Sequence, residues 1–307
     1  MARSAGLGPL LMPRQAPFLV LAVALAAVSF GSIFARLADA APLAIAAWRM
    51  GLAALVVIPV AFAGGTRGGR LEIRPASIAA AAGLFLALHF ATWIASLDYT
   101  SIARSVLLVS TAPIWVAVFQ YVSGRGAPAL RTVLALLLAV CGVAVASIGH
   151  GGGDGLLTGD LLAVAGAVAM AAYLLLSQKA QASLPFRRYL AIAYGSAAAL
   201  LWLAVTLTDT AAGGFNATTW LAFAGMAGIS QLIGHSGYNW SLRHLNPLFI
   251  AVALVGEPVI ASVLGWWLLG ERLDWQTGAG GILILAGILL GASAARALPA
   301  TVQTPAQ

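Results

Sequence analysis

Charged residues are scarce in this chain, and cysteine is nearly absent. Only 8% of the 307 residues are charged, against roughly 25% in an average soluble domain. The single cysteine, Cys141, lies in the middle of an apolar run and excludes a disulfide within the chain or a cysteine metal cluster. This composition is not that of a soluble enzyme or of a disulfide-rich secreted domain.

Apolar residues are what the chain has instead. Hydrophobic residues make up 61% of the sequence, and the mean hydropathy is +0.96. A membrane-spanning helix needs about 20 predominantly apolar residues. We expect ten such runs, at 17–36, 42–63, 77–97, 101–122, 132–149, 160–178, 189–208, 218–241, 246–269 and 276–295. Because the runs are continuous rather than alternating, they predict an all-α integral membrane protein with ten transmembrane helices.

The net charge of +7 does not indicate nucleic acid, because the charges are sorted along the chain. With the N-terminus in the cytoplasm, 12 of the 16 basic residues fall in cytoplasmic segments, Arg36 and Arg272 fall outside, and Arg49 and Arg104 fall within spans. Most acidic residues lie on the outer side. The positive-inside rule therefore predicts a multi-pass protein of the cell (inner) membrane with both termini in the cytoplasm.

A weak internal repeat divides the chain into two halves. Aligning Pro113 with Pro258, an offset of 145 residues, also aligns Leu97 with Leu242 and Gly142 with Gly287. The predicted organisation is a cytoplasmic segment 1–16, a five-helix repeat 17–149, an external glycine-rich linker 150–159, a second five-helix repeat 160–295 and a cytoplasmic tail 296–307. Five spans are an odd number, so the second half is expected to be inverted relative to the first. Such repeats are typical of secondary transporters, with the substrate between the halves.

Polar and aromatic residues inside the spans are the candidates for substrate binding, because polar groups are costly in hydrocarbon. Helical spacing places several of them on common faces, and we expect spans 1, 3, 4, 6, 8 and 9 to line one wet cavity. The alternative for any single histidine is a packing role. The candidates are His89, Trp93, Trp115, Tyr173, Gln231, His235, Tyr238 and Asn239.

Glu257 is the only carboxylate in the middle of a span. An apolar surrounding disfavours the charged form, which makes this residue a candidate for proton coupling. The alternative is a structural bond at the break caused by Pro258. The first half has Ala112 at the matching position.

Three further residues are candidates for conformational or electrostatic roles. Pro113 and Pro258 occupy matching positions within their spans, and paired helix breaks predict a role in gating. Arg49 is deep in its span and either holds an anionic group of the substrate or fixes the fold. Both alternatives stay open for Arg49 at this level.

Small residues mark the last span of each half. Gly142 and Ala146 in one, and Gly287 and Gly291 in the other, are spaced for close helix approach. We expect these spans to pack away from the substrate, either on each other or on a second protomer. Membrane lipids and a possible homo-oligomer are therefore the expected partners besides a small-molecule substrate.

Two segments of the sequence resemble motifs of the EamA branch of the drug/metabolite transporter superfamily. They are Leu97-Asp98-Tyr99-Thr100-Ser101-Ile102-Ala103 followed by Pro113, and Glu257-Pro258-Val259-Ile260-Ala261 followed by Leu269-Gly270-Glu271-Arg272-Leu273 and a glycine-rich last span. In the first half, Gly124-Arg125 stands where the second half has Gly270-Glu271. The resemblance covers about 17–295 and implies two inverted five-helix repeats, a central cavity, and export or exchange of small metabolites.

The leading hypothesis is a secondary-active carrier that works by alternating access. Glycines near 149–155 lack the Lys and Ser or Thr of a phosphate-binding loop, so a solute or ion gradient is the expected energy source. Cavity aromatics favour substrates with an apolar or planar part, and larger apolar amino acids are the expected class. A passive facilitator or lipid-handling protein is the alternative. An intramembrane enzyme is less favoured, because no carboxylate pair, metal cluster or cofactor motif is apparent.

Overall fold

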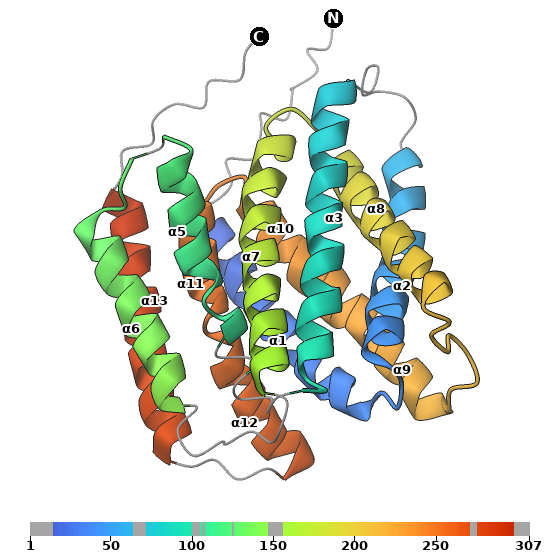
Figure 1. The fold of residues 1–307 in the computed structure, drawn as a ribbon. Helices are drawn as coiled ribbons and strands as arrows, with labels where there is room; N and C mark the ends of the chain where they lie inside the picture. The colour runs from blue at the N-terminus through green and yellow to red at the C-terminus, as the bar shows by residue number, and fades with distance from the viewer. Residues whose placement is uncertain are drawn as a thin grey trace, which may run out of the picture.

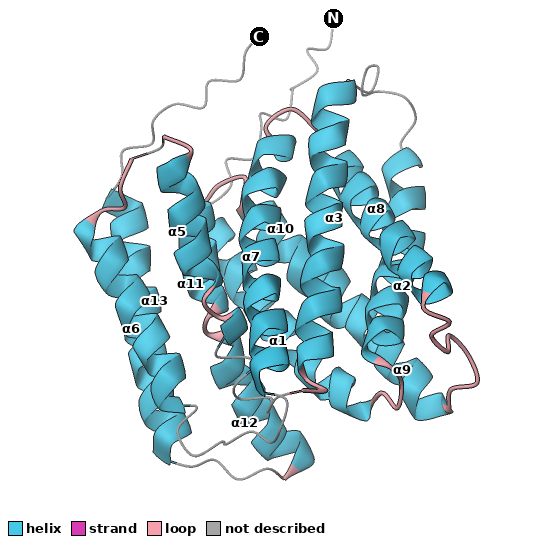
Figure 2. Cartoon of the chain, viewed as in Figure 1, coloured by secondary structure: helices cyan, strands magenta, loops and turns pink. Residues whose placement is uncertain are grey.

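The computed structural model describes residues 15–63, 72–99, 105, 108–124, 126–146, 156–270 and 275–297. Throughout these ranges the regular secondary structure is helical (Figure 2). Several predictions fall on residues outside the described ranges. They concern residues 1–14, most of the linker (150–155), the tail from 298, Arg104, Arg125, and the motif residues 100–103 and 271–273.

The helices follow the predicted apolar runs closely. The first half contains α1 (Ala16–Leu37), α2 (Pro42–Phe62), α3 (Ile73–Ser96), α5 (Ala112–Val122) and α6 (Leu130–Ala146). The second half contains α7 (Leu156–Gln181), α8 (Phe186–Leu207), α9 (Ala217–Gly225), η1 (Met226–His235), α10 (Ser236–Ser241), α11 (Pro247–Leu254), α12 (Glu257–Leu269) and α13 (Trp275–Ala297).

Every predicted run overlaps a helix, and six helical segments of the described chain are long and apolar enough to cross a membrane. The number of ten crossings stays a prediction. Some boundaries differ: α3 and α7 each begin four residues before the predicted run, at Ile73 and Leu156, so the end of the predicted linker is helical. The glycine cluster stops at Gly155, and the leucines that follow continue the apolar run.

Helix bounds repeat at the offset seen in the sequence. Shifting α2 by 145 residues covers 187–207, against Phe186–Leu207 for α8. Shifting α5 covers 257–267, against Glu257–Leu269 for α12. The packing repeats as well: α3 packs on α7 and α8, and the equivalent η1 packs on α1 and α2. The two halves are therefore related in their packing as well as in their sequence.

The pair α6 and α13 forms one flank of the molecule, where the two helices lie side by side (Figure 1). A Cβ added at Gly142 would lie 2.6 Å from the Gly280 carbonyl oxygen, and one at Gly287 would lie 2.7 Å from the Ala135 oxygen. Only glycine permits this approach of the two backbones. Of the two alternatives left by the sequence, these faces pack on each other within one chain.

The remaining helices surround a core of small and aromatic side chains. Alanines on α2, α3 and α8 are almost completely buried, which lets the helices approach closely. Leucine and valine side chains with large exposed fractions, such as Leu55 at 70% and Leu203 at 52%, lie on outward faces. In a chain of this hydropathy, lipid is the medium that covers them.

Candidate functional site

A central cavity lies where the two halves meet. It contains about 810 Å³ of space not filled by atoms, part of it open to the surroundings. Its lining comes from α1, α2, α3, α5, α7, η1, α10, α11 and α12. The lining residues are Val28, Ser32, Arg49, His89, Phe90, Trp93, Val109, Ser110, Ala112, Pro113, Met170, Leu174, His235, Tyr238, Ala251, Leu254, Val255, Glu257, Pro258 and Ala261.

The cavity brings together eight of the residues singled out from the sequence. They are His89, Trp93, His235, Tyr238, Glu257, Pro113, Pro258 and Arg49. Its lining follows the predicted spans 1, 3, 4, 6, 8 and 9, with α2 added through Arg49 alone. Sequence reasoning did not select the apolar lining, such as Phe90, Met170 and Leu174, because an apolar residue in a span carries no signal that distinguishes a cavity from lipid or core.

Four predicted binding residues lie outside the cavity lining: Trp115, Tyr173, Gln231 and Asn239. Trp115 is partly buried and packs against the main core. Tyr173 and Asn239 are fully buried and hydrogen-bonded to each other. Gln231 is bonded to Arg49 instead of facing the cavity. For these residues, the sequence identified polar or aromatic positions inside the spans but not their exposure to the cavity.

The π-helical segment η1 explains the displacement of Gln231. Gln231, His235 and Tyr238 were expected on one face of a regular α-helix, with Asn239 beside them. Residues Met226–His235 instead form a π-helix, with i→i+5 hydrogen bonds that widen the turn and rotate side chains relative to α-helical spacing. His235 and Tyr238 reach the cavity and share a hydrogen bond, while Gln231 points to α2.

A polar network behind the cavity connects α7, α8 and α10. The Tyr189 hydroxyl lies 2.6 Å from the Ser177 oxygen and 2.9 Å from Asn239 Oδ1. Asn239 Nδ2 also donates to the His235 carbonyl at 2.7 Å. Buried polar groups that satisfy one another fix side-chain positions. This network therefore holds the helix that presents His235 and Tyr238.

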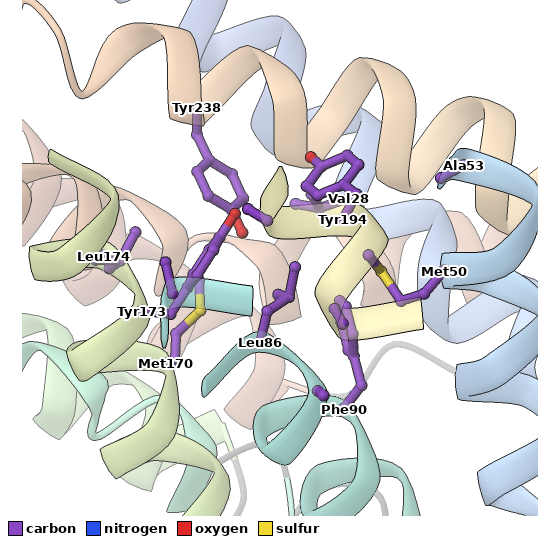
Figure 3. Close-up of a cluster of buried hydrophobic side chains, with 14 of the residues drawn as sticks. Val28, Met50, Ala53, Leu86, Phe90, Met170, Tyr173, Leu174, Tyr194 and Tyr238 are labelled. Atoms are coloured by element: carbon purple, nitrogen blue, oxygen red, sulfur yellow. The ribbon is translucent and has the colours of Figure 1, made fainter. Parts of the chain in front are cut away.

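Aromatic and thioether side chains form the apolar part of the centre. Figure 3 shows Phe90, Met50, Leu86, Met170, Tyr173 and Tyr238 converging from α2, α3, α7 and α10. Tyr194 of α8 lies among them, and its hydroxyl is 3.1 Å from the Ser236 oxygen. Of these side chains, Phe90, Met170 and Tyr238 line the cavity, and their surfaces suit a ligand with an apolar or planar part.

The α3 face presents His89 and Trp93 stacked on one another. Their ring centroids are 5.9 Å apart, and the rings are 10° from parallel. His89 Nδ1 lies 3.0 Å from the Gly166 carbonyl oxygen. A carbonyl only accepts, so Nδ1 carries the proton and a neutral ring keeps Nε2 as an acceptor. The hydrogen bond to α7 thus fixes which edge of His89 is available to a ligand.

Arg49 is held from two directions at the cavity. Its Nε donates to Gln231 Oε1 at 2.9 Å, and its guanidinium carbon lies 4.1 Å from the centre of the Phe90 ring. The side chain is only 3% exposed. The aromatic face stabilises the cation, and the amide sets the orientation of the guanidinium plane.

Two interrupted helices meet at the cavity. In the first half a helical stretch ends at Val109, and α5 begins at Ala112 after the turn Ser110–Thr111. In the second half α11 ends at Leu254, and α12 begins at Glu257 after Val255–Gly256. These turns match at an offset of 145. Pro113 and Pro258 lie in the first turn of a new helix, where a missing N–H costs little, and not in the interior of a kinked one.

A second cavity adjoins the central one. Ser32, Arg49 and Trp93 line both, and the second also contacts Arg36, Pro42 and Asp98 near the ends of α1, α2 and α3. The two cavities therefore adjoin at Ser32, Arg49 and Trp93, and the second lies toward the helix ends. The described residues contain no group of three or more His, Cys, Asp or Glu side chains placed to hold a metal ion.

Known proteins resemble this chain in sequence and in fold. The sequence profile of the EamA-like transporter family matches residues 16–148 and again residues 157–292. An uncharacterized transporter of Archaeoglobus fulgidus is 24% identical over 273 residues, which is 88% of this chain and 94% of that protein. A crystal structure described only as that of a protein has a TM-score of 0.76 and 19% identity, and the match covers 92% of this chain and all of that one.

The profile match covers most of the chain in two consecutive copies, in the same order as the two halves of the structure. A transporter family accounts for the apolar helices and for the polar cavity between the halves. The protein therefore belongs to the EamA-like transporter family and is a multi-pass membrane transporter, not an enzyme.

Proposed function

We propose that the protein is a secondary-active carrier of the inner membrane that exports or exchanges small metabolites, with amino acids as the principal class. Transport takes place by alternating access: the two halves rock about the central cavity and expose it to one side at a time. The observation that carries the proposal is the central cavity lined by both halves, at which both interrupted helices end. Broken helices of this kind are the sites of substrate binding in many carriers.

The chemistry of the lining supports amino acids. Arg49 and Glu257 bring groups that can carry opposite charges to one cavity, and Met170, Leu174 and Phe90 supply an apolar wall. A zwitterion with an apolar side chain presents matching groups. In the predicted orientation, the second cavity near Arg36 and Asp98 lies toward the outer side.

Energy coupling is assigned to Glu257. It lines the cavity at the start of α12, and among the described residues its carboxylate has no hydrogen-bond or ion-pair partner. A carboxylate in such a place exchanges protons with whichever side the cavity faces. Protons that enter through it would drive substrate out.

Transport by purified protein in proteoliposomes tests this function. Vesicles are loaded with a mixture of labelled amino acids, and efflux is followed with and without an imposed pH gradient, external side acidic. We expect efflux that the gradient accelerates. Efflux without gradient dependence would favour a passive facilitator, and no efflux above protein-free vesicles would reject amino acids as substrates.

A further inference from the structure

Arg49 has hydrogen-bonding capacity that the described residues do not use. A guanidinium carries five N–H donors. Its Nε is bonded to Gln231, but no described residue accepts from either Nη, and no described carboxylate lies within 4 Å. With the side chain 3% exposed, a buried cation without an anionic partner is costly. The free edge of the guanidinium, formed by the two Nη groups, is the one suited to bidentate contact with an oxyanion.

A purely structural arginine would look different. The N–H groups of such a residue donate hydrogen bonds to carbonyl oxygens at helix ends or to carboxylates. Here Gln231 and Phe90 fix the position and plane of the guanidinium but leave its end open. The contacts orient the group without neutralising it, as expected for a preorganised binding residue.

A second unpaired donor occurs at the same place. Trp93 Nε1 is buried and has no partner among the described residues. Trp93 and Arg49 both line the central cavity and the adjoining one, so a ligand that passes between them contacts both. The unpaired polar groups described here, the Arg49 Nη groups and Trp93 Nε1, are all hydrogen-bond donors, which indicates a ligand group rich in acceptors.

We propose that Arg49 binds the carboxylate of the transported solute, a monocarboxylate with an apolar body. The inference rests on the proposed carrier function and names the group by which the cavity recognises its substrate. One guanidinium balances one negative charge, and Glu257 in the same cavity opposes a second, so a carboxylate fits better than a phosphate dianion. Met170 and Leu174 face the apolar part.

Direct binding to the purified full-length protein tests this assignment without requiring transport. Calorimetry compares a panel of apolar amino acids with their amides, and L-leucine with 4-methylpentanoate and 3-methylbutylamine, which lack its amine and its carboxylate respectively. We expect the compounds that keep the carboxylate to bind about 10- to 100-fold more tightly than those without it, the usual effect of losing a charge-assisted hydrogen bond. Equal binding, or no binding of any acid in the panel, would overturn the proposal.

Variants of Arg49 connect the preference to this residue. Arg49→Gln should abolish the tighter binding of acids than of amides. Arg49→Lys should retain part of this preference, because lysine keeps the positive charge but lacks the bidentate guanidinium donors. Arg187→Gln is the matched control, since Arg187 is exposed at the start of α8. A preference that persists in folded Arg49→Gln would overturn the assignment. If that variant does not fold, the ligand series on the unmodified protein decides.

The two proposals fail separately. Carboxylate-selective binding without transport in proteoliposomes would contradict the carrier function but support the carboxylate site at Arg49. Transport of amides and amines in place of acids would support the carrier function but contradict the carboxylate site.

Discussion

The two helix breaks at the cavity have the same backbone design but different chemistry. Each consists of a two-residue turn followed by a helix with proline in its first turn. At the first break the residue before proline is Ala112, whereas at the second it is Glu257. Both line the cavity. The two copies thus share the geometry that opens a helix at the centre, and of these two matching positions only Glu257 is ionisable.

The carboxylate at the second break also changes the electrostatics of its helix. A helix N-terminus carries a partial positive charge. In α12 the Glu257 side chain lies at that end, while α5 has no acidic residue in its first turn. The cavity is therefore asymmetric: Arg49 and the end of α5 favour anions, and Glu257 favours protons or cations. A carrier for a zwitterion coupled to protons needs such a division.

The largest effect is expected from removing the chemical difference between the breaks. Glu257→Gln leaves a group of the same shape that does not exchange protons. Transport driven by a pH gradient should fall at least about tenfold, a change of 1.4 kcal/mol or more in the coupled step, while substrate exchange without a gradient persists. Paired efflux and exchange assays measure both.

Ala112→Gln is the matched control, since it places the same side chain at the first break. It should keep gradient dependence. Gradient-driven transport at the normal rate in Glu257→Gln would show that this residue has no part in proton coupling. The two helix breaks would then share a backbone geometry without a functional difference in chemistry.

A smaller effect is expected from the feature that the breaks share. Pro258→Ala and Pro113→Ala restore an N–H and allow each helix to extend back through its turn. We expect transport to slow by about threefold in each, a barrier change near 0.7 kcal/mol, with unchanged substrate affinity. Initial rates and equilibrium binding separate the two quantities. A loss of affinity with a normal rate would assign the prolines to binding rather than gating.

The smallest effect on transport is expected away from the breaks, on the flank formed by α6 and α13. Gly142→Ala would place a methyl group 2.6 Å from the Gly280 carbonyl oxygen, and such overpacking costs about 1–3 kcal/mol of stability. Thermal unfolding should occur at a lower temperature, while substrate affinity stays unchanged.

Gly278→Ala provides the control on the same pair, because nothing lies within 4 Å of a Cβ there. It should unfold at the normal temperature. A loss of affinity in Gly142→Ala at normal stability would show that the flank belongs to the transport machinery.

The sequence predicted much of the fold because hydrocarbon imposes length and composition on a helix. α1, α2 and α8 agree with their predicted runs to within three residues at each end. The breaks were indicated by the paired prolines, although their place in the first turn of a new helix was visible only in the structure. The composition of residues 226–235 does not indicate that η1 is a π-helix. For that reason Gln231 was predicted to face the cavity, whereas in the structure it accepts a hydrogen bond from Arg49.

The candidate site was harder to predict than the fold. Polar residues such as His89 and Glu257 stand out in an apolar span, and both line the cavity. Asn239 and Tyr173 stand out equally but satisfy each other in the core. Which polar group faces a partner and which faces empty space depends on helix rotation. Arg49 is the clearest case, because the sequence does not show that both of its Nη groups lack an acceptor among the described residues.

Accessibility of the cavity from each side of the membrane tests the central claim most directly. Ser32 lines both the central and the adjoining cavity, so Ser32→Cys, with Cys141 replaced by serine, reports on both. A membrane-impermeant maleimide is applied to either face of oriented vesicles, with and without a pH gradient. The account predicts labelling from both faces, in proportions that the gradient shifts. Labelling from one face only, under every condition, would contradict alternating access at this cavity.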